Sequence, residues 1–166
     1  MLSAPERHSE GSPMERVRDL GLVLKGRVPT NPAGIYHPVL LTGNLAHVSG
    51  QIPRLPDGTL LCGIAGDTAS LEEATEAARN CGLTMLSTLE AQLGSLDRVV
   101  RVVKVNGYVA AHPDFKDQSK VINAVSNLFI EVFGPAGKSA RSAIGVSSLP
   151  LGITCEVEAV VEVDLS

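Results

Sequence analysis

The sequence of 166 residues has little aromatic character and no tryptophan. Aromatic residues make up 3% of the chain, whereas proteins that bind single-stranded nucleic acids usually stack bases on aromatic side chains beside a basic surface. The formal net charge is −4, so the composition does not indicate a basic surface either. We therefore expect no nucleic-acid partner, and a core built from Val, Leu, Ile and Ala.

Cysteine is also scarce, and its pattern excludes two classes of small scaffold. Cys62, Cys81 and Cys155 are widely spaced and odd in number, with no CxxC pair and no Cys/His cluster. The odd number and wide spacing do not indicate a disulfide framework, and without a Cys/His cluster no zinc site is indicated, so we predict no metal. No Walker or Rossmann glycine pattern appears, and we predict no cofactor. The chain has no apolar leader and no run of transmembrane length, so we expect a cytoplasmic protein without a membrane partner.

The remaining composition is that of a folded domain. Hydrophobic residues make up 44% of the chain, enough for one domain with its own core. We divide the chain into an N-terminal extension over residues 1–33, with a short helix near Met14–Gly21 and a connector, and a single domain over residues 34–166.

Two long helices and several strands are predicted within this domain. Ser70 and Glu73 form a capping-box pattern, apolar residues follow at spacings of three and four, and Gly94 ends the first helix. The second helix covers Ser119–Phe133. Strands are predicted on both sides of Thr42–Asn44, over Val99–Val109, and from Ile153 to Val163, where aliphatic residues alternate with polar ones. This order of elements indicates an α+β fold.

One arginine and one glutamate stand in apolar strands near the end of the chain. Arg141 lies in Ala140–Ile144 and Glu156 in Ile153–Ala159, which we interpret as neighbouring strands. A guanidinium binds a carboxylate through two parallel hydrogen bonds, and a glutamate can orient a water or move a proton. Together they suggest a site for a small organic acid. The alternative is that both are solvated strand residues beside a hairpin.

Three ordered motifs resemble the Rid family of reactive-intermediate deaminases, also called the YjgF-like or L-PSP endoribonuclease family. They are Gly34–Tyr36 with Ser49–Pro53, then Val103–Val109, and finally Ala140–Ser142 with Leu149–Pro150 and Glu156–Ala159. The resemblance implies a chorismate-mutase-like α+β fold, in which two long helices pack on one face of a mixed sheet. It also implies a homotrimer with sites in the clefts between subunits.

The resemblance implies an activity and roles for individual residues. Family deaminases hydrolyse 2-imino or 2-enamino acids to 2-keto acids and ammonia. Arg141 matches the arginine that binds the substrate carboxylate, and Glu156 matches the glutamate near the attacking water. The residues that match the substrate-binding positions are Tyr36, Ser49, Gly50, Asn123 and Ala143.

The sequence also departs from the family pattern. Ala143 stands where many family deaminases have a cysteine, and Asp117–Lys120 lengthens the loop before the second helix, which suggests a divergent subgroup. One alternative is a non-catalytic module that binds a small carboxylate in the same cleft. Another is an endoribonuclease or translation inhibitor, but the acidic net charge and the lack of a His pair placed for acid/base cleavage argue against it.

Overall fold

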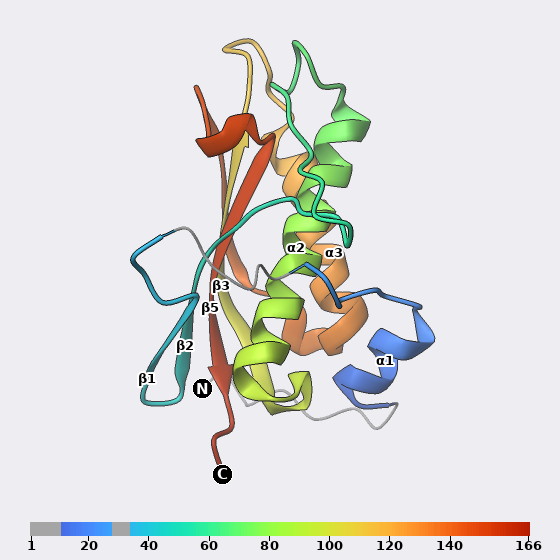
Figure 1. The fold of residues 1–166 in the computed structure, drawn as a ribbon, viewed down its shortest axis with the longest axis vertical. Helices are drawn as coiled ribbons and strands as arrows, with labels where there is room; N and C mark the ends of the chain where they lie inside the picture. Colours follow the sequence, from blue (N-terminus) through green and yellow to red (C-terminus); the bar gives the residue numbers. More distant parts are fainter. Residues whose placement is uncertain (1–10, 28–33) are drawn as a thin grey trace.

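In the computed structural model, which describes residues 11–27 and 34–166, two long helices pack on one face of a five-stranded sheet (Figure 1). The helices are α1 (Pro13–Asp19), α2 (Leu71–Leu93) and α3 (Gln118–Phe133). The strands are β1 (Val39–Thr42), β2 (Leu45–Gln51), β3 (Val99–Ala110), β4 (Ala140–Val146) and β5 (Cys155–Val163). Short 3-10 turns cover Leu96–Arg98, Gly134–Gly137 and Pro150–Gly152. The α+β prediction is confirmed. No helix among the described residues is long and apolar enough to cross a membrane.

The sequence signals for α2 act as predicted. The Ser70 hydroxyl accepts a hydrogen bond from the Glu73 amide at 3.1 Å, and the Glu73 carboxylate accepts one from the Ser70 amide at 2.8 Å. Gly94 ends the helix with a left-handed φ of 81°, a conformation that favours glycine. The predicted apolar positions of α2 are all buried, namely Ala74, Ala78, Cys81, Met85 and Leu89.

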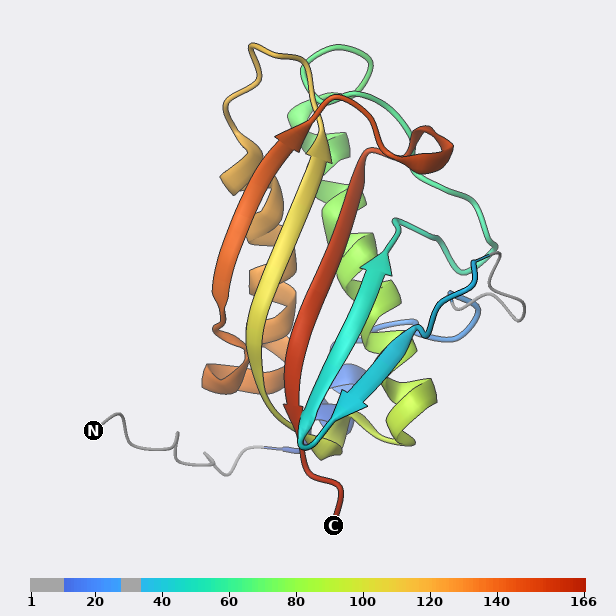
Figure 2. The ribbon, with the colours of Figure 1, turned by 90° about the vertical axis from the view of Figure 1, so that its left-hand side faces the viewer.

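The sheet has the strand order β1-β2-β5-β3-β4, and its uncovered face is turned to the viewer in Figure 2. β3 and β4 are parallel, and the other pairs are antiparallel. β3 therefore lies between β4 and β5, and our interpretation of the Arg141 and Glu156 strands as neighbours is wrong. The reason is that α3 carries the chain back to pair β4 in parallel with the outer edge of β3, which leaves the inner edge for β5.

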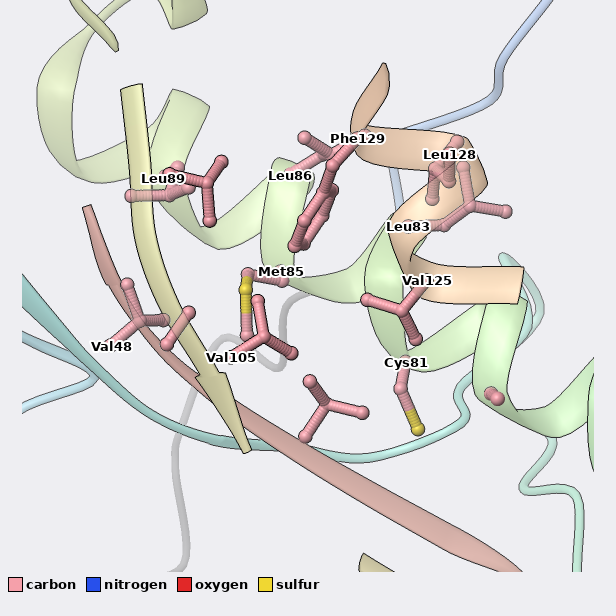
Figure 3. Close-up of a cluster of buried hydrophobic side chains, with 14 of the residues drawn as sticks. Val48, Cys81, Leu83, Met85, Leu86, Leu89, Val105, Val125, Leu128 and Phe129 are labelled. Carbon is pink, nitrogen blue, oxygen red and sulfur yellow. The ribbon is translucent and has the colours of Figure 1, made fainter. Parts of the chain in front are cut away.

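The core fills the space between the sheet and the two long helices. Every second residue of β5 is buried beneath the helices, as the alternation of the sequence predicts: Cys155, Val157, Ala159, Val161 and Val163. In Figure 3, Met85 of α2 and Phe129 of α3 lie with Val105 of β3 in this apolar layer. No helix of the described residues packs against the opposite face of the sheet (Figure 2).

The segment from α1 to Arg27 packs on the domain and covers the outer side of α2. Val17 and Leu24 are buried in the core. The Ser87 hydroxyl donates to the Leu24 carbonyl at 2.8 Å, and the buried Arg27 guanidinium donates to Asn80 Oδ1, also at 2.8 Å. Burial lowers the pKa of Arg27. These contacts explain why the polar residues Asn80 and Ser87 of α2 are buried.

The starts of α3 and α1 test two interpretations of the sequence. Asp117–Lys120 does not lengthen a loop, because Asp117 is the N-cap and α3 begins at Gln118. The short helix predicted near Met14–Gly21 is α1. Most of the predicted connector, residues 28–33, lies outside the described residues, as do residues 1–10. The boundary between extension and domain at residue 33 stays a prediction.

Candidate functional site

The predicted site residues fall on two different sides of the sheet. Across the β3–β4 ladder, Arg141 pairs with Val105 and Ala143 with Gly107. Residues paired across a ladder share a face, and successive residues of a strand alternate between faces. Val105 is buried beneath the helices, so Arg141 and Ala143 lie on the helix-covered side at the edge strand. Glu156 pairs with Tyr108, three residues from Val105, and lies on the uncovered face.

On the covered side, α3 holds the Arg141 guanidinium in place. Nη1 donates to Asn123 Oδ1 at 2.9 Å and to Ser126 Oγ at 3.0 Å, and Nη2 donates to the Ser119 carbonyl at 3.4 Å. No described residue accepts a hydrogen bond from Nε. These acceptors are all uncharged, so no carboxylate among the described residues pairs with the guanidinium, and its Nε–H has no acceptor among them.

In the structure, Asn123 contacts Arg141, and Ser126 joins the residues of the candidate site. Asn123 binds the arginine directly, so its amide orients Arg141 in this structure. Ser126 was not predicted, because a serine in the middle of a helix carries no signal for such a contact. Ala143, on the same face of β4, packs against the core. We refer to Arg141, Asn123 and Ser126 below as the arginine edge.

On the uncovered face, a β-bulge shapes the backbone beside Glu156. Val48 pairs with Ala159 and Gln51 with Val157, so β2 takes three steps where β5 takes two, and Ser49 and Gly50 share one partner position. A Cβ atom on Gly50 would overlap the Glu156 carboxylate. Gly50 is therefore the residue type that lets the Glu156 side chain lie across β2.

Buried polar contacts hold this bulge from below. The Gln51 amide donates to the Ser49 carbonyl at 2.9 Å and accepts a hydrogen bond from the Thr88 hydroxyl of α2 at 2.8 Å. The Ser49 hydroxyl donates to the His37 carbonyl at 2.7 Å and so ties the segment that carries Tyr36 to the sheet. Ser49 thus acts first as a structural anchor in this chain.

A hollow of about 430 Å³ lies beside the bulge on the uncovered face. It brings Tyr36 and Ser49 together with polar and charged residues that were not predicted as site residues, namely His37, His47, Lys104, Asn106 and Glu158. The Lys104 ammonium donates to the Ser142 hydroxyl at 3.2 Å. A hollow of this size can enclose part of a small organic molecule.

Glu158 sits next to Glu156 on the same face of β5. Its Oε1 accepts hydrogen bonds from Asn106 Nδ2 at 2.9 Å and from the Tyr108 hydroxyl at 3.0 Å. Burial raises the pKa of Glu156, and the negative charge of Glu158 raises it further. The hydrogen bond to Glu158 likewise raises the pKa of Tyr108. We refer to Glu156, Glu158, Tyr108 and Gly50 below as the glutamate face.

A signal for Glu158 was present in the sequence, because the alternation of the last strand places Glu156 and Glu158 on one face. The alternation in β3 likewise places Asn106 and Tyr108 on one face. The alternation does not give the strand order. The strand order is needed to show that Asn106 and Tyr108 of β3 lie beside the glutamates of β5. Within residues 11–27 and 34–166, no group of three or more His, Cys, Asp or Glu side chains is arranged to hold a metal ion.

The chain belongs to the family described as Endoribonuclease L-PSP, whose family model matches residues 27–163. Protein TCP17 of Trypanosoma cruzi is 40% identical over 159 residues, which cover 87% of this chain and 99% of that protein. The family resemblance found in the sequence is thereby confirmed.

Two solved structures place the chain within the family. A protein from Shewanella oneidensis is 28% identical with a TM-score of 0.86, over 92% of this chain and 100% of that one. RidA from a Psychrobacter species is 26% identical with a TM-score of 0.59, over 84% of this chain and 96% of that one. At nearly equal identity the backbone is much closer to the first, which agrees with a divergent subgroup.

Proposed function

We propose that this protein hydrolyses reactive 2-imino or 2-enamino acids to 2-keto acids and ammonia, at a site made by two copies of the chain. The observation that carries this proposal is the position of Arg141, which α3 holds with uncharged acceptors while its Nε–H has no acceptor among the described residues. A guanidinium held by neutral acceptors can bind a carboxylate through a charge-assisted hydrogen bond, which supports a role for Arg141 as the carboxylate anchor. The similarity to RidA supports the same class of reaction.

The chemistry requires a carboxylate anchor and a base. Arg141 binds the carboxylate of R–C(=NH)–COO⁻, and a water oxygen attacks the imine carbon while the C=N electron pair moves to nitrogen. Glu156 accepts a proton from that water and returns a proton to the nitrogen. The intermediate then carries C–OH and C–NH₂, and its hydroxyl proton passes to the nitrogen by way of the Glu156 carboxylate. The C–N bond breaks as the C=O bond forms, which gives R–CO–COO⁻ and NH₃, so that one water is consumed for each ammonia. A carboxylate with a raised pKa is a stronger base for this step than an ordinary one.

The two halves of the site lie on opposite faces of one sheet, so a single chain does not bring them together. If the arginine edge of one copy meets the glutamate face of the next, the contact joins two different surfaces, and such head-to-tail contacts form a ring when the rotation between copies closes. We propose a homotrimer on this basis and on the family resemblance. Three copies of 17.4 kDa give about 52 kDa.

The test is complementation between two inactive variants. Arg141→Ala keeps Glu156, and Glu156→Gln keeps Arg141, and each variant alone should lose turnover of an imine generated in situ. Co-expression at equal levels places both intact residues at about a quarter of the shared sites, if assembly is random. The mixture should therefore recover up to about a quarter of the wild-type rate. Light scattering on the same samples gives the assembly size.

The outcomes separate the alternatives. A mixture as inactive as its parents would contradict a site shared between copies. A wild-type protein that binds 2-keto acids in a calorimetric titration but turns over no imine would instead be the non-catalytic carboxylate-binding module.

A second candidate, RNA cleavage, has one observation in its favour. The sequence shows no His pair placed for acid/base work, but His37 and His47 both line the hollow on the uncovered face, together with Lys104. Two imidazoles and an ammonium are the groups that phosphodiester cleavage needs. Cleavage of a labelled single-stranded RNA by a wild type that turns over no imine, and loss of this cleavage in folded His47→Ala, would favour this function over the first.

A further inference from the structure

We infer that Glu158 is a positioning residue that acts on the proposed hydrolysis through Glu156. The inference rests on the proposed function for its catalytic meaning, but its structural basis is independent. Glu158 lies two residues from Glu156 on the same face of β5, and two donors from β3 fix its carboxylate, the Asn106 amide at 2.9 Å and the Tyr108 hydroxyl at 3.0 Å. A carboxylate held by two donors stays ionised and stays in place.

The fixed charge matters because the groups of β3, α2 and the β2 bulge that lie near Glu156 are uncharged. Tyr108, its partner on β3, donates its hydroxyl to Glu158. Beneath the sheet, the Cys81 thiol of α2 donates to the Cys155 carbonyl at 3.3 Å, and burial raises the pKa of this thiol well above its ordinary value, so it is uncharged. β2 contributes Ser49 and Gly50 here, which do not titrate.

Two further titratable residues of the uncovered face, Lys104 and His47, lie near Glu158. Lys104 of β3 and His47 of β2 both pair with Val160 of β5. Both residues line the hollow that also includes Glu158. In the proposed assembly, Arg141 of a second copy faces the site, and the substrate carboxylate balances its charge. These groups are the same in wild type and in Glu158 variants, so a comparison between the two isolates the effect of Glu158.

Glu158 therefore serves the reaction by keeping Glu156 basic. A second negative charge at a fixed position disfavours ionisation of Glu156, so the ionised form that remains binds the proton of the attacking water more strongly. Removal of the charge in Glu158→Gln should lower kcat by about five- to tenfold and move the acid limb of the kcat profile to lower pH. KM should stay unchanged, because Arg141 is untouched.

The experiment measures protonation and turnover separately. The carboxyl ¹³C resonance of Glu156, assigned by its loss in Glu156→Gln, is followed against pH in wild type, Glu158→Gln and Glu158→Asp. Glu162→Gln is the matched control, since Glu162 lies on the same face of β5 and pairs with Arg101 at 2.9 Å, away from Glu156. Melting curves of all variants are recorded to verify folding.

We expect the titration midpoint of Glu156 to fall in Glu158→Gln, to fall less in Glu158→Asp, and to stay unchanged in Glu162→Gln. An unchanged midpoint in folded Glu158→Gln would overturn the inference, whatever the turnover. A lower midpoint without any wild-type imine turnover would confirm the coupling of the two glutamates and reject the proposed reaction, so the two failures are distinguishable. If Glu158→Gln does not fold, an unchanged midpoint in Glu158→Asp overturns the inference equally.

Discussion

The two faces of the sheet differ in what their side chains do, although the same five strands supply both. On the covered face, Val105, Val157 and Val161 are almost inaccessible to water and pack against α2 and α3. On the uncovered face, the same strands carry an Arg101–Glu162 ion pair, the Lys104–Ser142 contact and the two adjacent glutamates. Alternate residues of a strand thus serve different ends: those on the covered face stabilise the fold, and those on the uncovered face carry the polar and charged groups. Arg141 is the exception, because it is a charged residue on the covered side, and it stands at the edge strand.

The strongest test of this separation is Arg141→Ala. Loss of one partner of a charge-assisted pair in a partly desolvated cleft costs about 2–5 kcal/mol, or roughly 30- to several-thousand-fold in affinity for 2-keto acids. The melting temperature should change little, because the three acceptors of Arg141 lie in an exposed or half-buried environment. Calorimetric titration of wild type, Arg141→Ala and Arg141→Lys measures this, and Lys should rescue in part, since an ammonium lacks the planar fork. Equal affinity in wild type and Arg141→Ala would place the ligand elsewhere.

Adjacent residues of β3 allow a matched comparison of the two faces. Val105→Ala removes two methyl groups from a fully buried side chain and should lower the free energy of unfolding by about 2 kcal/mol. Asn106→Ala, one residue further on the uncovered face, loses one hydrogen bond to Glu158 and should lower it by less than about 1 kcal/mol. Urea denaturation of wild type and both variants measures these free energies of unfolding. Equal losses would show that the uncovered face carries as much stability as the core.

Gly50→Ala should reduce turnover and leave the fold intact. The added methyl group displaces the Glu156 carboxylate, which is the mobile end of a side chain, so the backbone need not move. We expect about a tenfold lower kcat, equivalent to about 1.4 kcal/mol, with the same melting temperature. Unchanged kcat together with a crystal structure showing Glu156 displaced would remove Glu156 from the mechanism.

The smallest effect is the stability gain expected from Glu156→Gln. Burial and Glu158 raise the pKa of Glu156, so the folded state binds its proton more tightly than the unfolded state. Wild type therefore loses stability as the pH rises from the ordinary glutamate range, about 4.3, through the raised pKa of the folded state. Gln has no such loss, and the difference in melting temperature should be near zero at low pH and should favour the variant at neutral pH. A variant that is less stable at neutral pH would show that a cation holds Glu156 in the assembly.

Local patterns in the sequence predicted the elements well, and for physical reasons. The capping box of α2, the glycine that ends it and the alternation of β5 are properties of neighbouring residues, and each has the predicted structure. The interpretation of Arg141 and Glu156 as residues of adjacent strands failed, because strand order depends on a parallel crossover through α3 that no local pattern encodes.

The candidate site shows the same limit. Arg141 and Glu156 were first singled out as charged residues in apolar strands, and Gly50 and Asn123 by family resemblance. The roles of all four in substrate binding or catalysis stay predictions. The contacts among them follow from pairing across strands and from α3, so Ser126 and the fixed position of Glu158 needed the structure. A residue that acts through another residue has no motif of its own.

The central position of β5 affects how the sheet folds during synthesis of the chain. β5 follows every other strand in the chain, yet it joins β2 on one side to β3 on the other. Until residue 163 has left the ribosome, the β1–β2 hairpin and the β3–α3–β4 unit have no shared strand, and the inner edges of β2 and β3 are both open to unwanted pairing. The sheet is therefore closed after its synthesis, by its last strand, and the glutamate face forms in the same step.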